Sequence, residues 1–142
     1  MEFIRSANPS HPFCLSVSFS APHARDGQPR EYPPDARDEG LYANATIPAP
    51  KLATDAAFRK LPDFAQKSEG RRRWERRFVT PEMFQRIVKD YYRLISGMDR
   101  EVGRIVEALG ERADNTVIVF MPALPVEKPV EVRLRLPANE RR

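Results

Sequence analysis

Residues 80–110 read Thr-Pro-Glu-Met-Phe-Gln-Arg-Ile-Val-Lys-Asp-Tyr-Tyr-Arg-Leu-Ile-Ser-Gly-Met-Asp-Arg-Glu-Val-Gly-Arg-Ile-Val-Glu-Ala-Leu-Gly. Apolar residues recur in this stretch at steps of three and four, the spacing of one face of an α-helix. The members of this stripe are Phe84, Ile87, Val88, Tyr91, Leu94, Ile95, Met98, Val102, Ile105, Val106 and Leu109. Thr80-Pro81 is typical of a helix start and Gly110 of a helix end. We therefore predict one long helix that packs on a flat surface such as a sheet.

Two short apolar runs, one before and one after this helix, predict β-strands. Residues 13–19 (Phe-Cys-Leu-Ser-Val-Ser-Phe) lie between two prolines, and residues 116–120 (Thr-Val-Ile-Val-Phe) follow the helix after a short turn. Their length and their aromatic or β-branched residues favour buried strands over helices. A strand, a crossover containing a long helix and a second strand form a parallel α/β unit. The predicted fold class is therefore α/β.

The first strand leads into Ser20-Ala21-Pro22-His23, so His23 is expected at the carboxyl edge of the sheet, where ligands bind in α/β proteins. Residues 24–67 are polar and rich in proline, which predicts a long loop with a short helix at Asp55–Lys60. Residues 1–120 thus form one partial domain.

Residues 121–142 break the α/β pattern with a tail rich in proline and arginine. The alternating residues 130–136 could form an edge strand, but no periodic helix follows. Two explanations stay open, a genuine alternative C-terminus and out-of-frame translation, and the abrupt change of composition favours the second.

Composition narrows the function only slightly. The 142 residues carry a formal net charge of +4, which is compatible with sulfate esters, phosphate or nucleic acid and selects none of them. The single cysteine, Cys14, excludes an internal disulfide. No apolar run is long enough for a membrane span, and the first residues lack the apolar core of a signal peptide, so we expect a cytoplasmic protein.

Three stretches, in this order, resemble the sulfatases of the alkaline-phosphatase-like superfamily. Residues 12–23 look like the family strand and its Ser-x-Ser-x-Pro-His-type turn. Residues 91–105 (Tyr-Tyr-Arg-Leu-Ile-Ser-Gly-Met-Asp-Arg-Glu-Val-Gly-Arg-Ile) are similar to the long family helix, and residues 114–120 resemble the strand that leads into the metal-binding loop. The resemblance covers about residues 11–120. It implies an interior fragment of the family's α/β/α sandwich, with two parallel strands, one long helix and a long proline-rich loop.

The resemblance also implies a chemistry, the hydrolysis of sulfuric esters. Sulfatases attack sulfur with a formylglycine, made from Cys or Ser in a Cys-x-Pro/Ala-x-Arg motif, and a calcium ion held by acidic residues polarises the sulfate. His23 matches the family histidine at this turn. An imidazole suits the role because it titrates near neutral pH and can donate a proton to a sulfate oxygen or to the leaving group.

The chain departs from the family at the nucleophile and the metal site. Cys14 is followed by Leu-Ser-Val, so it does not stand in a formylglycine motif, and the family motif and its Asp pair precede the matched region. After Phe120 the chain reads Met-Pro-Ala-Leu-Pro where the family has Thr-Ser-Asp-Asn-Gly, and these side chains offer calcium no oxygen. Lys128 lies in the unmatched tail and takes no family role. We therefore expect neither formylglycine nor bound calcium in this chain. It should be inactive alone, unless a separately encoded N-terminal half supplies the nucleophile.

A second function, from a different class, rests on the basic run Arg71–Arg77. Its arginines could bind anions or nucleic acid, with Trp74 as a stacking platform, as part of a non-catalytic module. The plainer interpretation, which we favour, is a solvated segment before the long helix, and nucleic acid is not expected as a partner. For His23 the plain interpretation is a loop histidine without a ligand, but the surrounding turn favours a sulfate contact.

Overall fold

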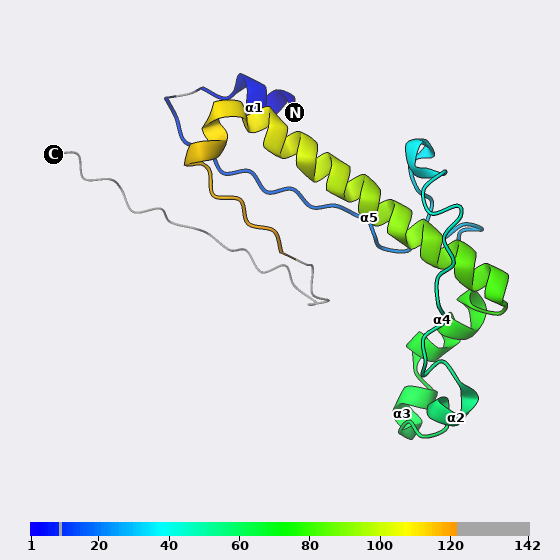
Figure 1. Cartoon of the computed structure of the whole chain (residues 1–142). Helices are drawn as coiled ribbons and strands as arrows, with labels where there is room; N and C mark the ends of the chain where they lie inside the picture. Colours follow the sequence, from blue (N-terminus) through cyan, green and yellow to red (C-terminus); the bar gives the residue numbers. More distant parts are fainter. Residues whose placement is uncertain (9, 122–142) are drawn as a thin grey trace.

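The computed structural model describes residues 1–8 and 10–121 and is built around one long helix (Figure 1). This helix, α5, spans Pro81–Leu109. Thr80 caps its N-terminus, because the hydroxyl Oγ1 accepts a hydrogen bond of 3.2 Å from the backbone N of Met83. Gly110 ends the helix with a φ of 54°, a backbone conformation that favours glycine. The predicted helix is confirmed.

The other helices are short. They are α1 (Glu2–Ser6), the 3₁₀ helix η1 (Ala36–Asp38), α2 (Asp55–Phe58), α3 (Asp63–Gln66), α4 (Glu69–Arg77) and the 3₁₀ helix η2 (Gly110–Asn115). The short helix expected at 55–60 is present as α2. The run Arg71–Arg77, expected as a solvated segment before the long helix, instead belongs to a helix of its own. Ser68 caps α4, and the i,i+4 pair Arg71–Glu75 (2.7 Å) supports it.

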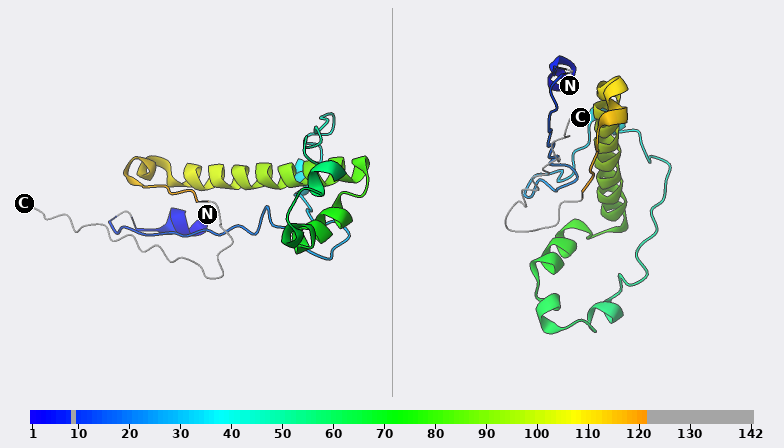
Figure 2. Two further views of the ribbon diagram at one scale, coloured as in Figure 1. Left: turned by 90° about the horizontal axis from the view of Figure 1, so that it is seen from below. Right: turned by 90° about the vertical axis from the view of Figure 1, so that its left-hand side faces the viewer.

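The two segments predicted as strands are extended but form no sheet within residues 1–8 and 10–121. Figures 1 and 2 show both running along α5. A β-strand requires backbone hydrogen bonds to a neighbouring strand, and in the described part of the chain residues 13–19 and 117–121 make none. The expectation of two paired parallel strands is therefore not met by this structure, whose described elements are helices joined by extended chain.

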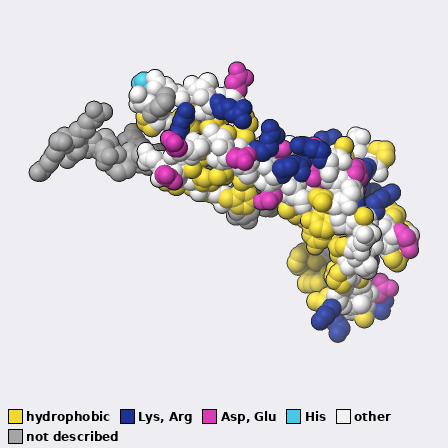
Figure 3. Space-filling model, turned by 45° about the horizontal axis from the view of Figure 1, so that its top comes forward, with side chains coloured by type: hydrophobic (Ala, Val, Ile, Leu, Met, Phe, Trp, Pro, Cys, Tyr) yellow, Lys and Arg dark blue, Asp and Glu magenta, His cyan; other side chains and the backbone are white. Residues whose placement is uncertain are grey.

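Little apolar surface is fully buried. Among the described residues, the buried apolar side chains are Ile4 and Leu109, where α1 and η2 meet the end of α5. Arg112 strengthens this contact by donating a 3.0 Å hydrogen bond to the carbonyl of Ile4. The extended segments by contrast expose their apolar side chains, with Leu15 42% and Val117 79% accessible. Figure 3 shows apolar patches on one face of the molecule, between charged groups.

Residues 30–47 are tied to α5 by polar contacts, which we call the polar seam. From Asp38 to Ile47 the segment runs broadly antiparallel to α5, because its helix partners move back from Arg100 to Gln85, whereas Arg30 contacts the middle of α5 at Asp90. Its pairs are Arg30–Asp90, Asp38–Arg100, Leu41–Arg93, Tyr42–Ser96, Ala43–Lys89 and Ile47–Gln85. At the last pair, the Gln85 amide bonds both the N (2.9 Å) and the carbonyl (2.7 Å) of Ile47, as a neighbouring strand would. The predicted long loop is thus present and firmly anchored.

Asp38 is one of the two buried carboxylates of the seam, with Asp90. It is 2% exposed, and its carboxylate accepts two hydrogen bonds from the Arg100 guanidinium, at 2.5 and 2.9 Å. These bonds hold the pKa of Asp38 below its usual value despite burial. Gly97 makes the close approach possible, because a Cβ there would lie 2.9 Å from Asp38 Oδ2.

Candidate functional site

His23 lies in the turn at the end of the first extended segment. Its backbone N donates to the carbonyl of Ser20 at 2.9 Å. Its ring Nδ1 lies 2.7 Å from the carbonyl of Ala24, and because a carbonyl only accepts, Nδ1 carries the proton. The side chain is exposed, and no described residue is hydrogen-bonded to Nε2. The second ring nitrogen is therefore accessible to a ligand, and its role is set by the bond that the first one makes.

The loop that follows His23 closes on itself. The backbone N of Arg25 donates to the carbonyl of Glu31 at 2.8 Å, and the N of Gln28 donates to the carbonyl of Arg25 at 3.2 Å. Gly27, with a φ of 80°, makes the reversal possible. We call residues 25–31 the closing loop. Asp26 lies near the start of the loop and Glu31 lies at its end, so each of the two legs of the loop carries one carboxylate.

One guanidinium of α4 binds both legs of the closing loop. Arg77 donates through Nη2 to Asp26 Oδ1 at 2.6 Å and through Nε to Glu31 Oε2. The side chains of Arg77 and Glu31 are only 13% and 11% exposed, so solvent screens this ion pair weakly. Burial raises the pKa of Glu31, but the bonds from Arg77 outweigh it and leave that pKa lowered. The guanidinium also lies 5.6 Å from the centre of the Tyr32 ring.

A second anchor joins the end of the closing loop to α5. Arg30 donates through Nε and Nη2 to the two carboxylate oxygens of Asp90, both at 2.7 Å, and it also pairs with Glu39. Asp90 is 2% exposed and accepts a further 2.8 Å bond from Arg93. Burial pushes the pKa of Asp90 upward, but the two arginines prevail and the pKa is lowered. The buried Asp90 carboxylate is thus charged, and Arg30 and Arg93 offset its negative charge.

The arginine run offers little unpaired charge. Each of its five guanidiniums lies within 4.0 Å of a carboxylate, in the pairs Arg71–Glu75, Arg72–Glu69, Arg73–Asp26, Arg76–Glu31 and Arg77–Asp26. Trp74 packs on Phe78 with ring centres 4.6 Å apart and is partly covered. The run therefore serves mainly to hold α4 and the closing loop, and nothing in this arrangement favours the nucleic-acid alternative.

The described residues do not fit a calcium ion or a formylglycine. Within 1–8 and 10–121, no three His, Cys, Asp or Glu side chains are grouped so that they could hold a metal. The buried carboxylates Asp38 and Asp90 are both committed to arginines. Cys14 is exposed in an extended segment and lacks the sequence that is converted to formylglycine. Lys128 and the alternating residues 130–136 lie outside the described residues.

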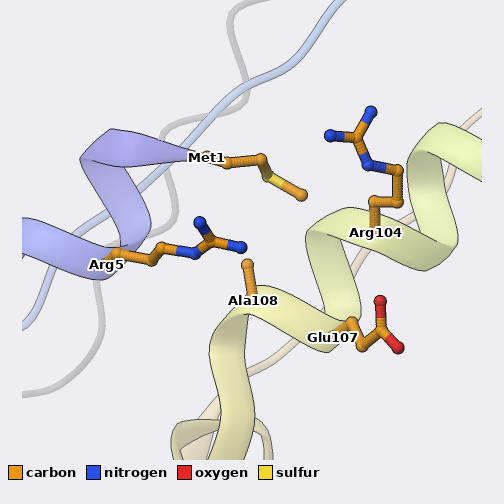
Figure 4. A pocket seen from close by; sticks show the side chains of 5 residues that line it. All are labelled: Met1, Arg5, Arg104, Glu107 and Ala108. Atoms are coloured by element: carbon orange, nitrogen blue, oxygen red, sulfur yellow. The ribbon is translucent and has the colours of Figure 1, made fainter.

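A separate hollow of about 240 Å³ lies between α1 and the C-terminal part of α5. Figure 4 shows its lining, in which Arg5 of α1 and Arg104 of α5 stand near Met1, Ala108 and Glu107. Arg104 pairs with Glu101 at 2.7 Å, outside this lining. The hollow is open and lies at the opposite end of α5 from α4, the helix that contacts the closing loop.

None of the helices in the described part of the chain is both long and apolar enough to cross a lipid bilayer.

Comparisons with known proteins give two matches. The sulfatase family model matches residues 1–121, a range that includes the His23 turn, α5 and the second extended segment. An arylsulfatase of Clostridium perfringens (strain 13 / Type A) is 27% identical over 128 residues, and the alignment covers 85% of this chain. It covers 24% of the arylsulfatase, so this chain spans about a quarter of the length of that relative. No solved structure matches the chain significantly.

Proposed function

Because this chain belongs to the sulfatase family, we propose that it forms the part of a sulfuric ester hydrolase that contacts the substrate sulfate, through His23. One observation carries the assignment. The family match runs through the turn that holds His23, and there the ring is exposed with Nδ1 fixed by the Ala24 carbonyl. The proposed substrate class, a sulfate ester, is that of the sulfatase family and agrees with the similarity to an arylsulfatase.

The hydrogen bond at Nδ1 determines what His23 can do. With Nδ1–H bonded to the Ala24 carbonyl, a neutral ring presents a lone pair at Nε2 and a protonated ring presents an N–H donor there. The protonated ring suits an anionic sulfate oxygen, to which it donates a charge-assisted hydrogen bond. The same proton can pass to the departing alkoxide oxygen, which leaves His23 neutral and the alcohol released.

The extended segments are proposed to become parallel strands when further strands pair with them. In the described part of the chain, residues 13–19 and 117–121 make no backbone–backbone hydrogen bonds, and their apolar side chains are exposed. Unpaired extended segments of this kind can form hydrogen bonds with neighbouring strands. We propose a separately encoded N-terminal half as the source of these neighbours. That half would also bring the formylglycine and the acidic calcium ligands that the described residues do not provide. The chain alone is then expected to contact sulfate but not to hydrolyse its esters.

The test is a titration of the full chain with sodium sulfate, followed through the ring ¹⁵N and ¹H resonances of its two histidines. The ring signals of His23 should shift in a saturable way as sulfate is added. His11, which is also exposed, is the matched control and should barely move. His23→Gln should abolish the saturable response and His11→Gln should preserve it. Equal shifts of both histidines, or none at His23, would refute the proposed contact.

A further inference from the structure

The charged contacts around the closing loop point to a residue that acts on the sulfate site without touching sulfate. Both donor groups of Arg77 that face the loop, Nε and Nη2, are occupied by Glu31 and Asp26. A guanidinium committed to two carboxylates has little left to offer an anion. Its place in the fold suggests a different task, because the two carboxylates stand on the two legs of the loop that begins two residues after His23.

We propose that Arg77 is a positioning residue for His23, an inference that rests on the proposed function of His23. Arg77 belongs to α4, and among the described residues it is the one side chain that pairs with both Asp26 and Glu31. Arg73 and Arg76 each pair with one leg, at 3.2 and 3.1 Å, and are more exposed.

The path from Arg77 to the imidazole is short. Arg77 holds the legs together, the backbone bond from Arg25 to Glu31 closes the loop between them, and Arg25 follows Ala24. Ala24 carries the carbonyl that fixes Nδ1 of His23. If the legs separate, this carbonyl loses its fixed position, and the direction in which Nε2 faces is no longer defined. Arg30 supports the arrangement from the other side by tying the end of the loop to buried Asp90.

The experiment compares Arg77→Gln with Arg72→Gln in the full chain. Arg72 lies on the same helix and is exposed, and among the described residues its one carboxylate partner is Glu69 at 3.6 Å, so its loss should change nothing at the loop. In Arg77→Gln, the hydrogen-exchange protection of the Arg25 amide should fall roughly tenfold or more, the factor expected for the loss of a charged hydrogen bond. The His23 ring signals should broaden, and the sulfate-induced shift should require a higher sulfate concentration. Arg77→Lys keeps the positive charge but loses the planar guanidinium that can bind two carboxylates at once, so its effect should be intermediate.

The outcomes separate the two proposals. Unchanged Arg25 protection and an unchanged His23 sulfate response in Arg77→Gln would overturn the positioning role. If sulfate fails to shift His23 in the unaltered chain, the proposed function fails. Hydrogen exchange at the Arg25 amide still reports whether Arg77 holds the closing loop. If Arg77→Gln loses the helical circular dichroism of the chain, Asp26→Asn takes its place. That variant frees one leg and should lower Arg25 protection by a smaller factor, and no loss of protection would overturn the role.

Discussion

Because Asp38 lies close to α5, the same glycine-to-alanine substitution should have different effects on stability at two positions of that helix. Gly103 has no atom within 4 Å of the position that a Cβ would take, so Gly103→Ala adds helix propensity without a clash. Replacing glycine by alanine inside a helix is worth roughly 1 kcal/mol in the free energy of unfolding. Gly103→Ala should therefore stabilise the chain by about that amount.

Gly97→Ala gains the same propensity but places its Cβ 2.9 Å from Asp38 Oδ2. Asp38 cannot easily yield, because it is buried and both carboxylate oxygens are bonded to Arg100. Overpacking of this kind costs about 1–3 kcal/mol, so the net effect of Gly97→Ala lies between roughly zero and a loss of about 2 kcal/mol. The two variants should thus differ by about 1–3 kcal/mol in the free energy of unfolding.

Urea unfolding followed by circular dichroism at the helix band measures this difference. A double variant, Gly97→Ala with Asp38→Ala, completes the cycle and should show a favourable coupling between the two sites, because the second change removes the clash. If Gly97→Ala stabilises the chain as much as Gly103→Ala does, Asp38 does not pack against Gly97. The position of Asp38 in the polar seam would then be wrong.

Three further predictions concern the helix start and the seam. Thr80→Ala removes the N-cap bond to Met83 and should lower the free energy of unfolding by about 1 kcal/mol, measured by the same urea titration. Gln85→Ala removes both bonds to Ile47 and should raise hydrogen exchange at the Ile47 amide, whereas unchanged exchange there would contradict the seam. Asp38 and Asp90 have pKa values below the usual 3.8, so their contribution to stability is complete well above pH 3.8 and is lost as the pH falls through their folded pKa values. Asp90→Asn should lower the free energy of unfolding at pH 7, and below about pH 5 its stability should depend less on pH than that of the unaltered chain. An unchanged stability at pH 7 would contradict the Arg30–Asp90 and Arg93–Asp90 pairs.

The long helix could be read from the sequence because its signals are local. The cap at Thr80, the apolar stripe and Gly110 lie within one continuous stretch, and each acts on the backbone beside it. The resemblance to sulfatases rested on segments that the family model also matches. The position of His23 in a turn after an extended segment followed from the prolines and small residues around it.

The polar seam and the Arg77 contacts could not be read in the same way. Asp90 looks like a member of the polar face of α5, and its burial depends on Arg30, which stands 60 residues earlier in the chain. Such long-range pairs leave no periodic signal in the sequence. The partners of the arginine run were missed for a related reason, because the acidic residues that pair with Arg77 are Asp26 and Glu31, far from α4 in the sequence. The two strands were predicted from their composition, but a strand also needs neighbours, which the described residues do not provide.

The most direct test of the account is an aryl sulfate assay on the purified full chain. We predict no release of the phenol above the spontaneous rate, because Cys14 is not in a formylglycine motif and the described acidic residues do not group into a metal site. Turnover that His23→Ala abolishes and His11→Ala preserves would contradict this account, since it would mean that the chain carries a complete sulfatase site of its own.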